Sequence, residues 1–498
     1  MLLDATTDTS DGDVLHADIC IVGAGVAGIT LARELGAAGR SVLLLEAGGI
    51  EASEALQDLY RGKMTGLRTW ELHRMRIRQL GGSSNHWGGW CMPLHPDDFR
   101  ERAWIARSGW PLDYDELAPH YAYANRVVEI GDAPWDHPGL LARSPYPTLG
   151  DPRGDFETRA FLFSPPTRFG MTYREALIES DSVRTYLFAN VVEIVLDDAL
   201  GQVTRLSCKA YAGGDPHSFT VEANQFVLAL GGLENARLLL ASRRQIPEGV
   251  ANSSGAVGQF MEHPHYYNSA GTFLPRGADL QLYSRHTIEV PDGDATRAVD
   301  MLGVWAPSAA LRTSERLIDF TLELQLNQEV DNKLTARSAS SVIARRDREP
   351  IQAVFTLRAE QAPTADSRLT LSTSEVDELG MPRPELRWSV AHDDNVALAR
   401  ALRVAGLFVA RELGGRVFFP TSNGAFDWLT YPGGHHMGTT RMAKRAADGV
   451  VDRNSRAFDV ANLYVAGSSV FTTSGAANPT LTVLALTKRL ADHLLAPS

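Results

Sequence analysis

The fold of this chain is decided by residues 18–49, which read DICIVGAGVAGITLARELGAAGRSVLLLEAGG. The stretch opens with a short apolar run rich in β-branched residues, which is typical of a buried parallel strand. Three glycines spaced Gly-x-Gly-x-x-Gly follow, and the next apolar residues recur at helical spacing up to Gly39. A second apolar run then ends at Glu46. This order of strand, glycine turn, helix, strand and acid predicts a Rossmann-like unit that binds a dinucleotide.

Each glycine of the turn has its own task in that prediction. Gly23 permits the tight turn, Gly25 lets the backbone approach a pyrophosphate, and Gly28 lets the helix lie close to the strand. The phosphates are then expected on the free N–H groups at the positive end of the helix. Glu46 follows Gly28 by eighteen residues, where its carboxylate can accept a hydrogen bond from a ribose hydroxyl.

Composition sets the limits of the remaining interpretation. The chain has 498 residues, 44% hydrophobic and 22% charged, which is globular and long enough for two or three domains. Its net charge of −12 argues against nucleic acid or an anionic membrane as a main partner. No apolar run approaches eighteen residues, so no membrane span is expected.

The cysteines and the N-terminus indicate where the protein resides. Cys20, Cys91 and Cys208 have no paired spacing, which fits a reducing compartment better than a disulfide framework. Residues 1–17 are polar and acidic and lack the basic and apolar parts of a signal peptide. A cytoplasmic location is therefore expected, and residues 1–15 are expected to form a frayed tail.

Two further glycine-rich segments are expected to face the same dinucleotide. Residues 78–89 read RQLGGSSNHWGG, and such a loop can lay its backbone flat against an extended cofactor. The apolar run 226–230 is followed by Gly231 and Gly232 and then by helical spacing. This second strand–glycine–helix unit would bring Gly231 to the dinucleotide.

The other expected elements follow from hydrophobic periodicity. They are a charged helical stretch after Gly49, a helix at 114–128, loops at 131–169, a meander of strands at 191–196, 203–208 and 219–221, antiparallel strands at 320–324, 353–357 and 368–372, a helix at 395–413, a returning strand at 462–467, and a closing helix at 481–495.

The expected fold class is α/β, because the chain leaves the dinucleotide domain, builds a second domain, and returns to the first. The discontinuous Rossmann-like domain is assigned to residues 16–105, 185–270 and 430–498. An α+β substrate domain built on an antiparallel sheet is assigned to residues 106–184 and 271–429.

Two stretches near the C-terminus could carry chemistry. Residues 433–442 place His435 and His436 in a glycine-flanked loop, where a general base is accessible. Asn478 precedes a helix that starts at a proline. A histidine base and an amide donor facing a redox cofactor would deprotonate an alcohol while its carbon loses hydride. No metal site is expected, because adjacent histidines point apart in extended chain and no Cys or carboxylate cluster accompanies them.

Over nearly its whole length the chain resembles the glucose–methanol–choline (GMC) family of flavoprotein oxidoreductases. The resemblance rests on ordered motifs. They are the glycine fingerprint with Glu46, the Gly-Gly-Ser-Ser loop at 81–84, the stretch 110–121 (WPLDYDELAPHY), the stretch 257–264 (VGQFMEHP), and both C-terminal stretches.

This resemblance implies extended FAD as the cofactor, His435 as the catalytic acid/base, and Asn478 as the second catalytic position. It also implies a set of FAD-binding residues, namely Gly23, Gly25, Gly28, Glu46, Gly82, Ser83, Asn85, His86, Val192, Gly231, Gly467, Ser468, Pro479 and Thr480. Substrate contacts are expected from the 271–429 sheet and from the loops near Trp87 and Trp90.

Within the family, residues 81–87 look most like the sugar-, glycoside- and aminoglycoside-oxidising branch, which includes the pyranose oxidases. In pyranose 2-oxidase a Ser-Thr-His-Trp run carries a histidyl bond to the flavin. Here Asn85 replaces the threonine, so noncovalent FAD is the favoured expectation and a covalent link at His86 stays an alternative.

The function implied is that of an FAD-dependent oxidoreductase that transfers hydride from a sugar-like polyol to flavin N5. A redox-silent FAD lyase of the same fold, a nicotinamide-dependent dehydrogenase and a noncatalytic binding protein remain alternatives. The sequence leaves open the particular substrate, the oligomeric state, and whether oxygen, a quinone or another protein accepts the electrons.

Overall fold

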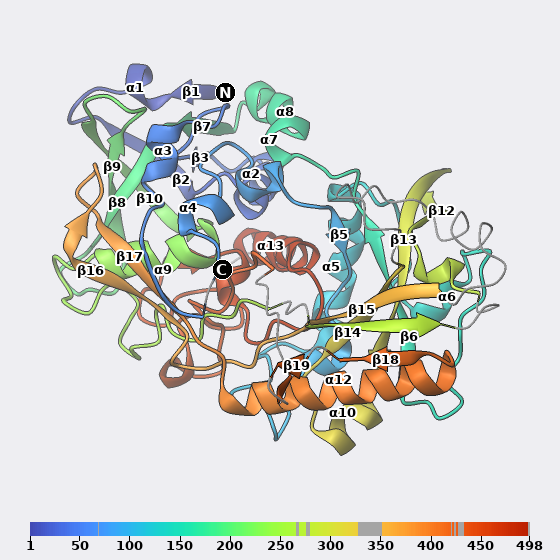
Figure 1. The fold of residues 1–498 in the computed structure, drawn as a ribbon. Coiled ribbons are helices and arrows are strands. Elements are labelled where there is room, and N and C mark those ends of the chain that lie inside the picture. Colours follow the sequence, from blue (N-terminus) through green and yellow to red (C-terminus); the bar gives the residue numbers. More distant parts are fainter. Residues whose placement is uncertain are drawn as a thin grey trace.

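The computed structural model describes residues 1–67, 69–264, 268–274, 279–326, 351–419, 421–422, 425–426 and 433–496. Its described strands form two large sheets and two small ones. In Figure 1 the first large sheet lies on the left, the second lies on the right, and the C-terminal helix α13 lies between them. In the part of the chain described, no helix is both long and apolar enough to cross a membrane.

The first large sheet has the order β1-β7-β3-β2-β10-β9-β8, and β21 also pairs with β10. Its strands are β1 Leu2–Asp4, β2 Val14–Val22, β3 Val42–Leu45, β7 Val183–Leu187, β8 Ala189–Leu196, β9 Val203–Ala210, β10 His217–Leu228 and β21 Leu463–Val465.

The second large sheet has the order β18-β11-β15-β14-β13-β6-β5, and β12 also pairs with β13. Its strands are β5 Trp90–Cys91, β6 Phe156–Phe163, β11 Asn268–Leu274, β12 His286–Asp292, β13 Ala295–Pro307, β14 Phe320–Leu326, β15 Ile351–Ala359 and β18 Arg416–Phe418. The small sheets contain β4 Lys63–Gly66, β16 Arg368–Val376 and β17 Pro382–Trp388, and β19 Thr421–Ser422 with β20 Ala425–Phe426.

The α-helices described are α1 Ala5–Asp8, α2 Val26–Ala37, α3 Glu54–Asp58, α4 Leu72–Met75, α5 Tyr114–Val127, α6 His137–Leu141, α7 Phe169–Thr172, α8 Arg174–Glu179, α9 Gly231–Ala241, α10 Ala309–Glu315, α12 His392–Glu412 and α13 Thr480–Leu495. The short 3₁₀ turns are η1 Gly82–Asn85, η2 Pro96–Phe99, η3 Gln281–Tyr283, η4 Ala446–Asp448 and η5 Ser468–Val470.

The fold class predicted from the sequence is confirmed. Strands β1, β7, β3, β2, β10 and β21 pair in parallel, and every residue of β3 is buried, as expected of a sheet covered on both faces. The second sheet pairs antiparallel throughout the pairs described. The domain boundaries given above stay a prediction.

The N-terminal tail was predicted wrongly. Residues 2–4 form strand β1, which pairs with β7, and Asp4 caps helix α1 by accepting from the N–H of Thr6 at 2.8 Å. Strand β2 begins at Val14 and pairs with β10 from there onward. The polar composition concealed apolar side chains, such as the fully buried Ala5, that fix the segment to the sheet edge.

The two strands predicted at 219–221 and 226–230 are one strand, β10. It stays continuous through its polar middle because β2 pairs with it from Val14 to Val22. Its first half also pairs antiparallel with β9, which completes the meander expected with β8. This strand therefore joins the meander to the parallel core.

Residues 131–169 are not only loops, because they contain α6 and β6. Strand β6 pairs with β13 along its full length, and its proline- and glycine-rich flanks had masked it. On α12 the predicted core face is buried, and Phe408 of that helix stacks on Phe156 of β6 with ring centroids 4.4 Å apart.

Two other segments differ from the prediction. Residues 368–372 belong to β16, which pairs with β17 in a separate small sheet, and not to the sheet that contains β14 and β15. The segment after Gly49 is only partly helical, because it includes β4, which pairs in parallel with β17. Pairing between strands that are far apart in the sequence leaves no local signal in it.

Candidate active site

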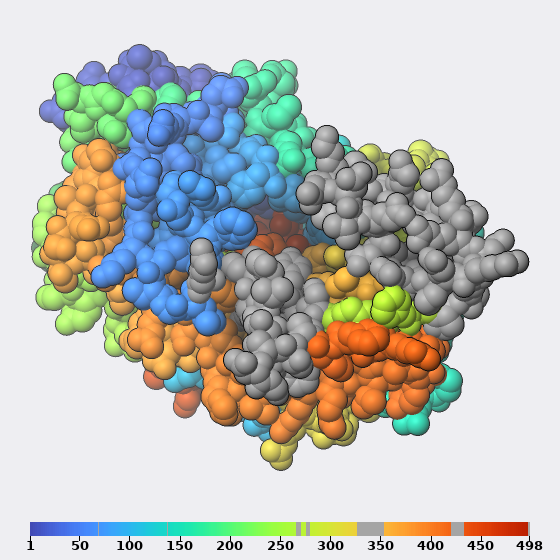
Figure 2. Space-filling model, viewed as in Figure 1, coloured from blue at the N-terminus to red at the C-terminus, as the bar shows by residue number. Residues whose placement is uncertain are grey.

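A cavity of about 550 Å³ reaches from the glycine turn before α2 to the loop at 433–436 and the start of α13. Figure 2 shows the surface hollowed near its centre, where atoms of the C-terminal segment, in red, are visible at depth beside N-terminal segments in blue. The predicted site residues that line the cavity are Gly23, Gly25, Glu46, Gly82, Ser83, His86, Gly231, His435, Gly467, Ser468, Asn478, Pro479 and Thr480.

The glycine turn has the close contacts that the sequence predicted. A Cβ atom on Gly28 would lie 1.8 Å from the carbonyl oxygen of Gly23, and one on Gly23 would lie 2.7 Å from that of Ala229. A Cβ atom on Gly25 would meet nothing within 4 Å. No side chain in the described chain caps α2, so its first N–H groups are available to a ligand in the cavity.

Glu46 is placed at the end of β3, beside the same turn. Its Oε2 accepts from the N–H of Ala24 at 2.9 Å, and its Oε1 accepts from the N–H of Gly48 at 2.7 Å. Burial raises the pKa of this carboxyl, while the backbone hydrogen bonds and Arg78 act against that shift. Each oxygen keeps a second acceptor position, which a ribose hydroxyl can use.

His435 and Asn478 meet at the other end of the cavity. His435 Nε2 and Asn478 Nδ2 lie 3.5 Å apart, although 43 residues separate them in the chain. Burial, and then the positive charge of Arg358, lower the pKa of His435 to about 4. The imidazole is therefore neutral in neutral solution, which is the state that accepts a proton.

The loop that carries His435 is fixed by two other predicted segments. Ser468 Oγ donates to the carbonyl of His436 at 2.8 Å, and the N–H of Gly438 donates to the carbonyl of Ser468 at 3.2 Å. Thr439 Oγ1 donates to the carbonyl of Gly232 at 2.6 Å. Gly232 is required there, because a Cβ atom on it would lie 2.0 Å from the carbonyl oxygen of His436.

The chain is similar to known proteins in sequence and in fold. The profile of a family described as GMC oxidoreductase matches residues 363–487, and one described as FAD dependent oxidoreductase matches residues 18–247. The chain is 25% identical, over 97% of its length, to the fructose dehydrogenase large subunit of Gluconobacter japonicus, and covers 98% of that protein.

It is also 25% identical, over 96% of its length, to 2-methyl-1,2-propanediol dehydrogenase of Mycolicibacterium austroafricanum, and covers 95% of it. Among solved structures, pyridoxine 4-oxidase from Mesorbium loti shares the fold, with a TM-score of 0.59 and 20% identity. The alignment covers 96% of this chain and 99% of that one.

The two family matches and both relatives support a GMC-type oxidoreductase for this chain. It is an FAD-dependent oxidoreductase that acts on CH–OH groups, and its cofactor is FAD. The residues of the cavity fit that cofactor, because an uncapped helix end, an open position at Gly25 and a placed carboxylate suit the dinucleotide part. His435 and Asn478 line the same cavity, so they would face the remaining part of a bound cofactor.

Several cavity residues were not predicted from the sequence. The guanidinium groups of Arg76 and Arg78 lie 4.1 and 4.6 Å from the ring centroid of Tyr60. Glu234 accepts from Arg76 at 2.6 Å, and although burial alone would raise its pKa, Arg237, Arg76 and Arg78 lower it to about 2. The Arg-x-Arg spacing just before the glycine-rich loop could have indicated these cations.

Arg358 on β15 brings the antiparallel sheet to the cavity. Its guanidinium carbon lies 3.9 Å from the ring centroid of Trp90, and its Nε and Nη2 donate to Glu323 Oε2 at 2.9 and 2.8 Å. Trp87 and Trp90 also line the cavity, in the region where substrate contacts were expected. A lone arginine in an alternating strand gives no sequence signal, because it could equally face water.

Three predicted residues are not among those that line the cavity. Gly28 packs against the turn, and Asn85 Nδ2 donates to the carbonyl of Leu80 at 2.9 Å. Val192 on β8 packs against a cluster that includes Leu56 and Tyr211. The structure therefore does not bring the side chains of Asn85 and Val192 to the cavity, and their assignment to FAD rests on the resemblance alone.

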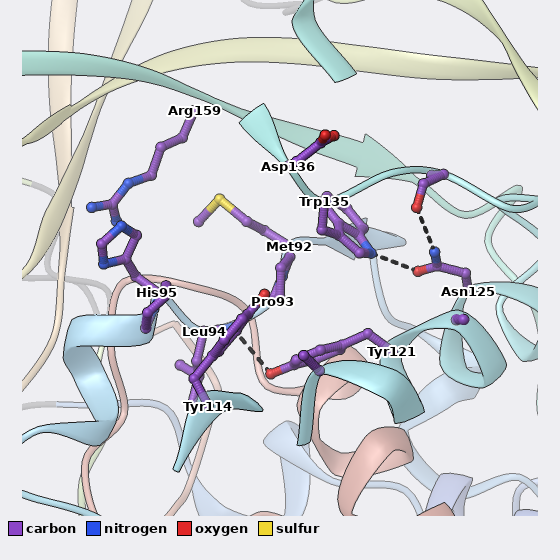
Figure 3. Close-up of a pocket in the computed structure, with 14 residues that line it drawn as sticks. Met92, Pro93, Leu94, His95, Tyr114, Tyr121, Asn125, Trp135, Asp136 and Arg159 are labelled. Carbon is purple, nitrogen blue, oxygen red and sulfur yellow. Dashed lines mark hydrogen bonds between the residues drawn. The ribbon is translucent and has the colours of Figure 1, made fainter. Parts of the chain in front are cut away.

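A second cavity, of about 500 Å³, lies between α5 and the segment at 92–96 (Figure 3). Two hydrogen bonds join lining residues: Trp135 Nε1 donates to Asn125 Oδ1 at 2.9 Å, and Tyr121 Oη accepts from the N–H of Leu94 at 3.3 Å. None of the predicted site residues is among those that line it. The residues predicted to carry the chemistry therefore line the first cavity and not this one.

Proposed function

We propose that this GMC oxidoreductase oxidises a hydroxyl group of a sugar, glycoside or aminoglycoside-like polyol, with His435 as the general base. The observation that carries the proposal is the 3.5 Å approach of His435 Nε2 to Asn478 Nδ2 within the cavity that also contains the glycine turn. A base and an amide donor at one end, and the dinucleotide cradle at the other, suit an alcohol held against a flavin.

The residues of the chain supply the proton chemistry of this reaction. A substrate hydroxyl donates to His435 Nε2, while the amide of Asn478 helps to orient the reacting oxygen. Burial, and then Arg358, lower the pKa of His435 and so keep the imidazole neutral, and the guanidinium also favours the negative charge that develops on that oxygen. When FAD is bound, it supplies the acceptor for the hydride that leaves the substrate carbon.

The full-length similarity to a fructose dehydrogenase subunit supports a sugar-like substrate. The indole of Trp90 and the guanidinium of Arg358 also line the cavity, and such groups suit a ring with several hydroxyls. The chain is just as similar in sequence to a propanediol dehydrogenase, so a small acyclic diol is the competing substrate class.

An anaerobic panel tests the proposal. The purified protein would be mixed with sugars, glycosides, aminoglycosides and 2-methyl-1,2-propanediol, and the visible absorbance of the flavin would be followed. We expect a sugar-like compound to bleach the flavin faster than the acyclic diol. Bleaching by the diol alone would overturn the substrate class, and bleaching by none of them would overturn the proposal itself. Readmission of air then tests whether oxygen accepts the electrons.

A further inference from the structure

The imidazole of His263 contacts the loop that carries His435. Its Nε2 accepts the backbone N–H of Gly434 at 2.9 Å. Within the described residues, Nδ1 of this ring has no hydrogen-bond partner. The bond from Gly434 to Nε2 is therefore the hydrogen bond that the ring makes with those residues. Gly434 has a φ of +77°, so the backbone immediately before His435 lies in the left-handed region that favours glycine.

The ring of His263 is itself held rigidly. It is fully buried, and its centroid lies 5.1 Å from that of Trp388 and 4.6 Å from that of His436. The backbone N–H of His263 donates to Gln361 Oε1 at 3.0 Å, and Trp388 Nε1 donates to the same oxygen at 3.0 Å. A side chain fixed on both sides can act as a rigid support for what it binds.

The bond to Gly434 completes a short ladder between two distant segments. Glu262 and Met437 exchange two backbone hydrogen bonds of 3.0 Å, and the N–H of Gly433 donates to the carbonyl of Pro264 at 3.3 Å. Between these points the loop bulges to present His435 toward the cavity. There the imidazole of His263 takes the place of the carbonyl that a partner strand would offer.

We propose that His263 is a positioning residue: by accepting the N–H of Gly434, it fixes the backbone from which His435 reaches Asn478. The inference rests on the proposed role of His435 as base. Burial, and then the neighbouring His435, lower the pKa of His263 to about 3, so the ring is neutral in neutral solution. The N–H of Gly434 donates to Nε2, so Nε2 is the unprotonated nitrogen of this neutral ring. His263 is not among the residues that line the cavity, so it acts on the substrate only through the loop.

Two substitutions separate the acceptor from the packing. His263→Phe keeps a ring between Trp388 and His436 but cannot accept the N–H of Gly434. His263→Gln offers a side-chain oxygen at about the position of Nε2. With the fastest-reacting compound of the panel, we expect His263→Phe to lower kcat roughly ten- to hundredfold with KM nearly unchanged, because small misplacements of a base are costly. We expect His263→Gln to recover most of kcat.

His286→Phe is the matched control, because it replaces a half-buried imidazole on β12 that bonds to Ser144 at 2.9 Å, away from the cavity. It should leave kcat unchanged. Equal rates for His263→Phe and the wild type would overturn the inference, and so would equal losses in His263→Phe and His263→Gln. His435→Ala separates the two proposals. A normal rate in that variant would contradict the role of His435 as base, whereas a loss of rate in His263→Phe would then show only that the loop matters for the reaction.

Discussion

His435 Nε2 and Asn478 Nδ2 lie 3.5 Å apart, although one belongs to a glycine-rich loop and the other precedes the closing helix. Neither group could reach the other through local structure. Ser468 in η5 and Gly232 at the start of α9 hold the loop from one side, and His263 accepts the N–H of Gly434 within it. The reaction proposed for this GMC oxidoreductase depends on that approach.

Replacing His435 by alanine should retain FAD and slow substrate-driven bleaching of the flavin by roughly 10²–10⁴-fold, the contribution of a general base. Stopped-flow absorbance under anaerobic conditions measures the rate. His16→Ala, which changes an exposed histidine, serves as the control. A near-normal rate in His435→Ala would move the base elsewhere, and His436 would be examined first.

The pH dependence of kcat/KM should reflect the low pKa of His435. Its base form is neutral, so we expect the rate to be constant above about pH 5 and to fall as the pH drops through about 4. Removing the cation with Arg358→Met should raise this pKa and shift the acid limb to higher pH. Arg358→Met leaves the charge of the buried Glu323 unpaired. The double variant Arg358→Gln/Glu323→Gln removes both charges of the pair and controls for that effect. An acid limb that stays in place in both variants would contradict the role of Arg358.

Alanine at Gly28 and alanine at Gly25 should affect different properties of the protein. A methyl group at Gly28 would lie 1.8 Å from the carbonyl oxygen of Gly23, so Gly28→Ala should lower the Tm of the apoprotein. At Gly25 the methyl group meets nothing within 4 Å, so Gly25→Ala should keep that Tm and weaken FAD binding. Calorimetry and flavin titration measure the two quantities. Normal FAD affinity in Gly25→Ala would place the phosphates elsewhere.

Glu46→Ala should raise the Kd of FAD at least tenfold, because it removes a ribose acceptor and the two contacts that order Ala24 and Gly48. Equilibrium titration of the apoprotein measures this change. Glu46→Gln keeps one acceptor oxygen, so its Kd for FAD should lie between that of Glu46→Ala and that of the wild type. Full flavin occupancy combined with slow turnover in Glu46→Ala would show that the carboxylate serves the reaction instead.

The state of His86 can be tested by denaturation. Its ring is half-buried in the cavity, and burial, and then Arg168, lower its pKa. We expect acid precipitation to release all the yellow colour, as for noncovalent FAD. Colour that stays in the wild-type pellet and washes out of His86→Ala would instead establish a covalent link at this residue.

Much of the fold could be predicted because its signals are local. The apolar runs of β2 and β3, the glycines between them and the periodicity of α12 each follow from a few neighbouring residues. Strand β6 was missed because its pairing with β13 is remote in sequence and its flanks look like loops. The same reason hid β1, whose partner β7 lies far along the chain.

The site was predicted as a set of residues but not as a geometry. Motifs indicated His435, Asn478 and Glu46, whereas the approach of Arg358 to Trp90 depends on how the second sheet packs against the first. His263 lies within a recognised motif, but its bond to Gly434 depends on the pairing of Glu262 with Met437. Contacts of this kind are set by tertiary packing, which no local pattern records.

The cavity is lined by residues as far apart in the sequence as Gly25 and Asn478, and this separation has a consequence for biosynthesis. The nascent polypeptide can form the glycine turn long before Ser468 and Asn478 have been translated. Stable capture of FAD is therefore expected only after both segments have left the ribosome.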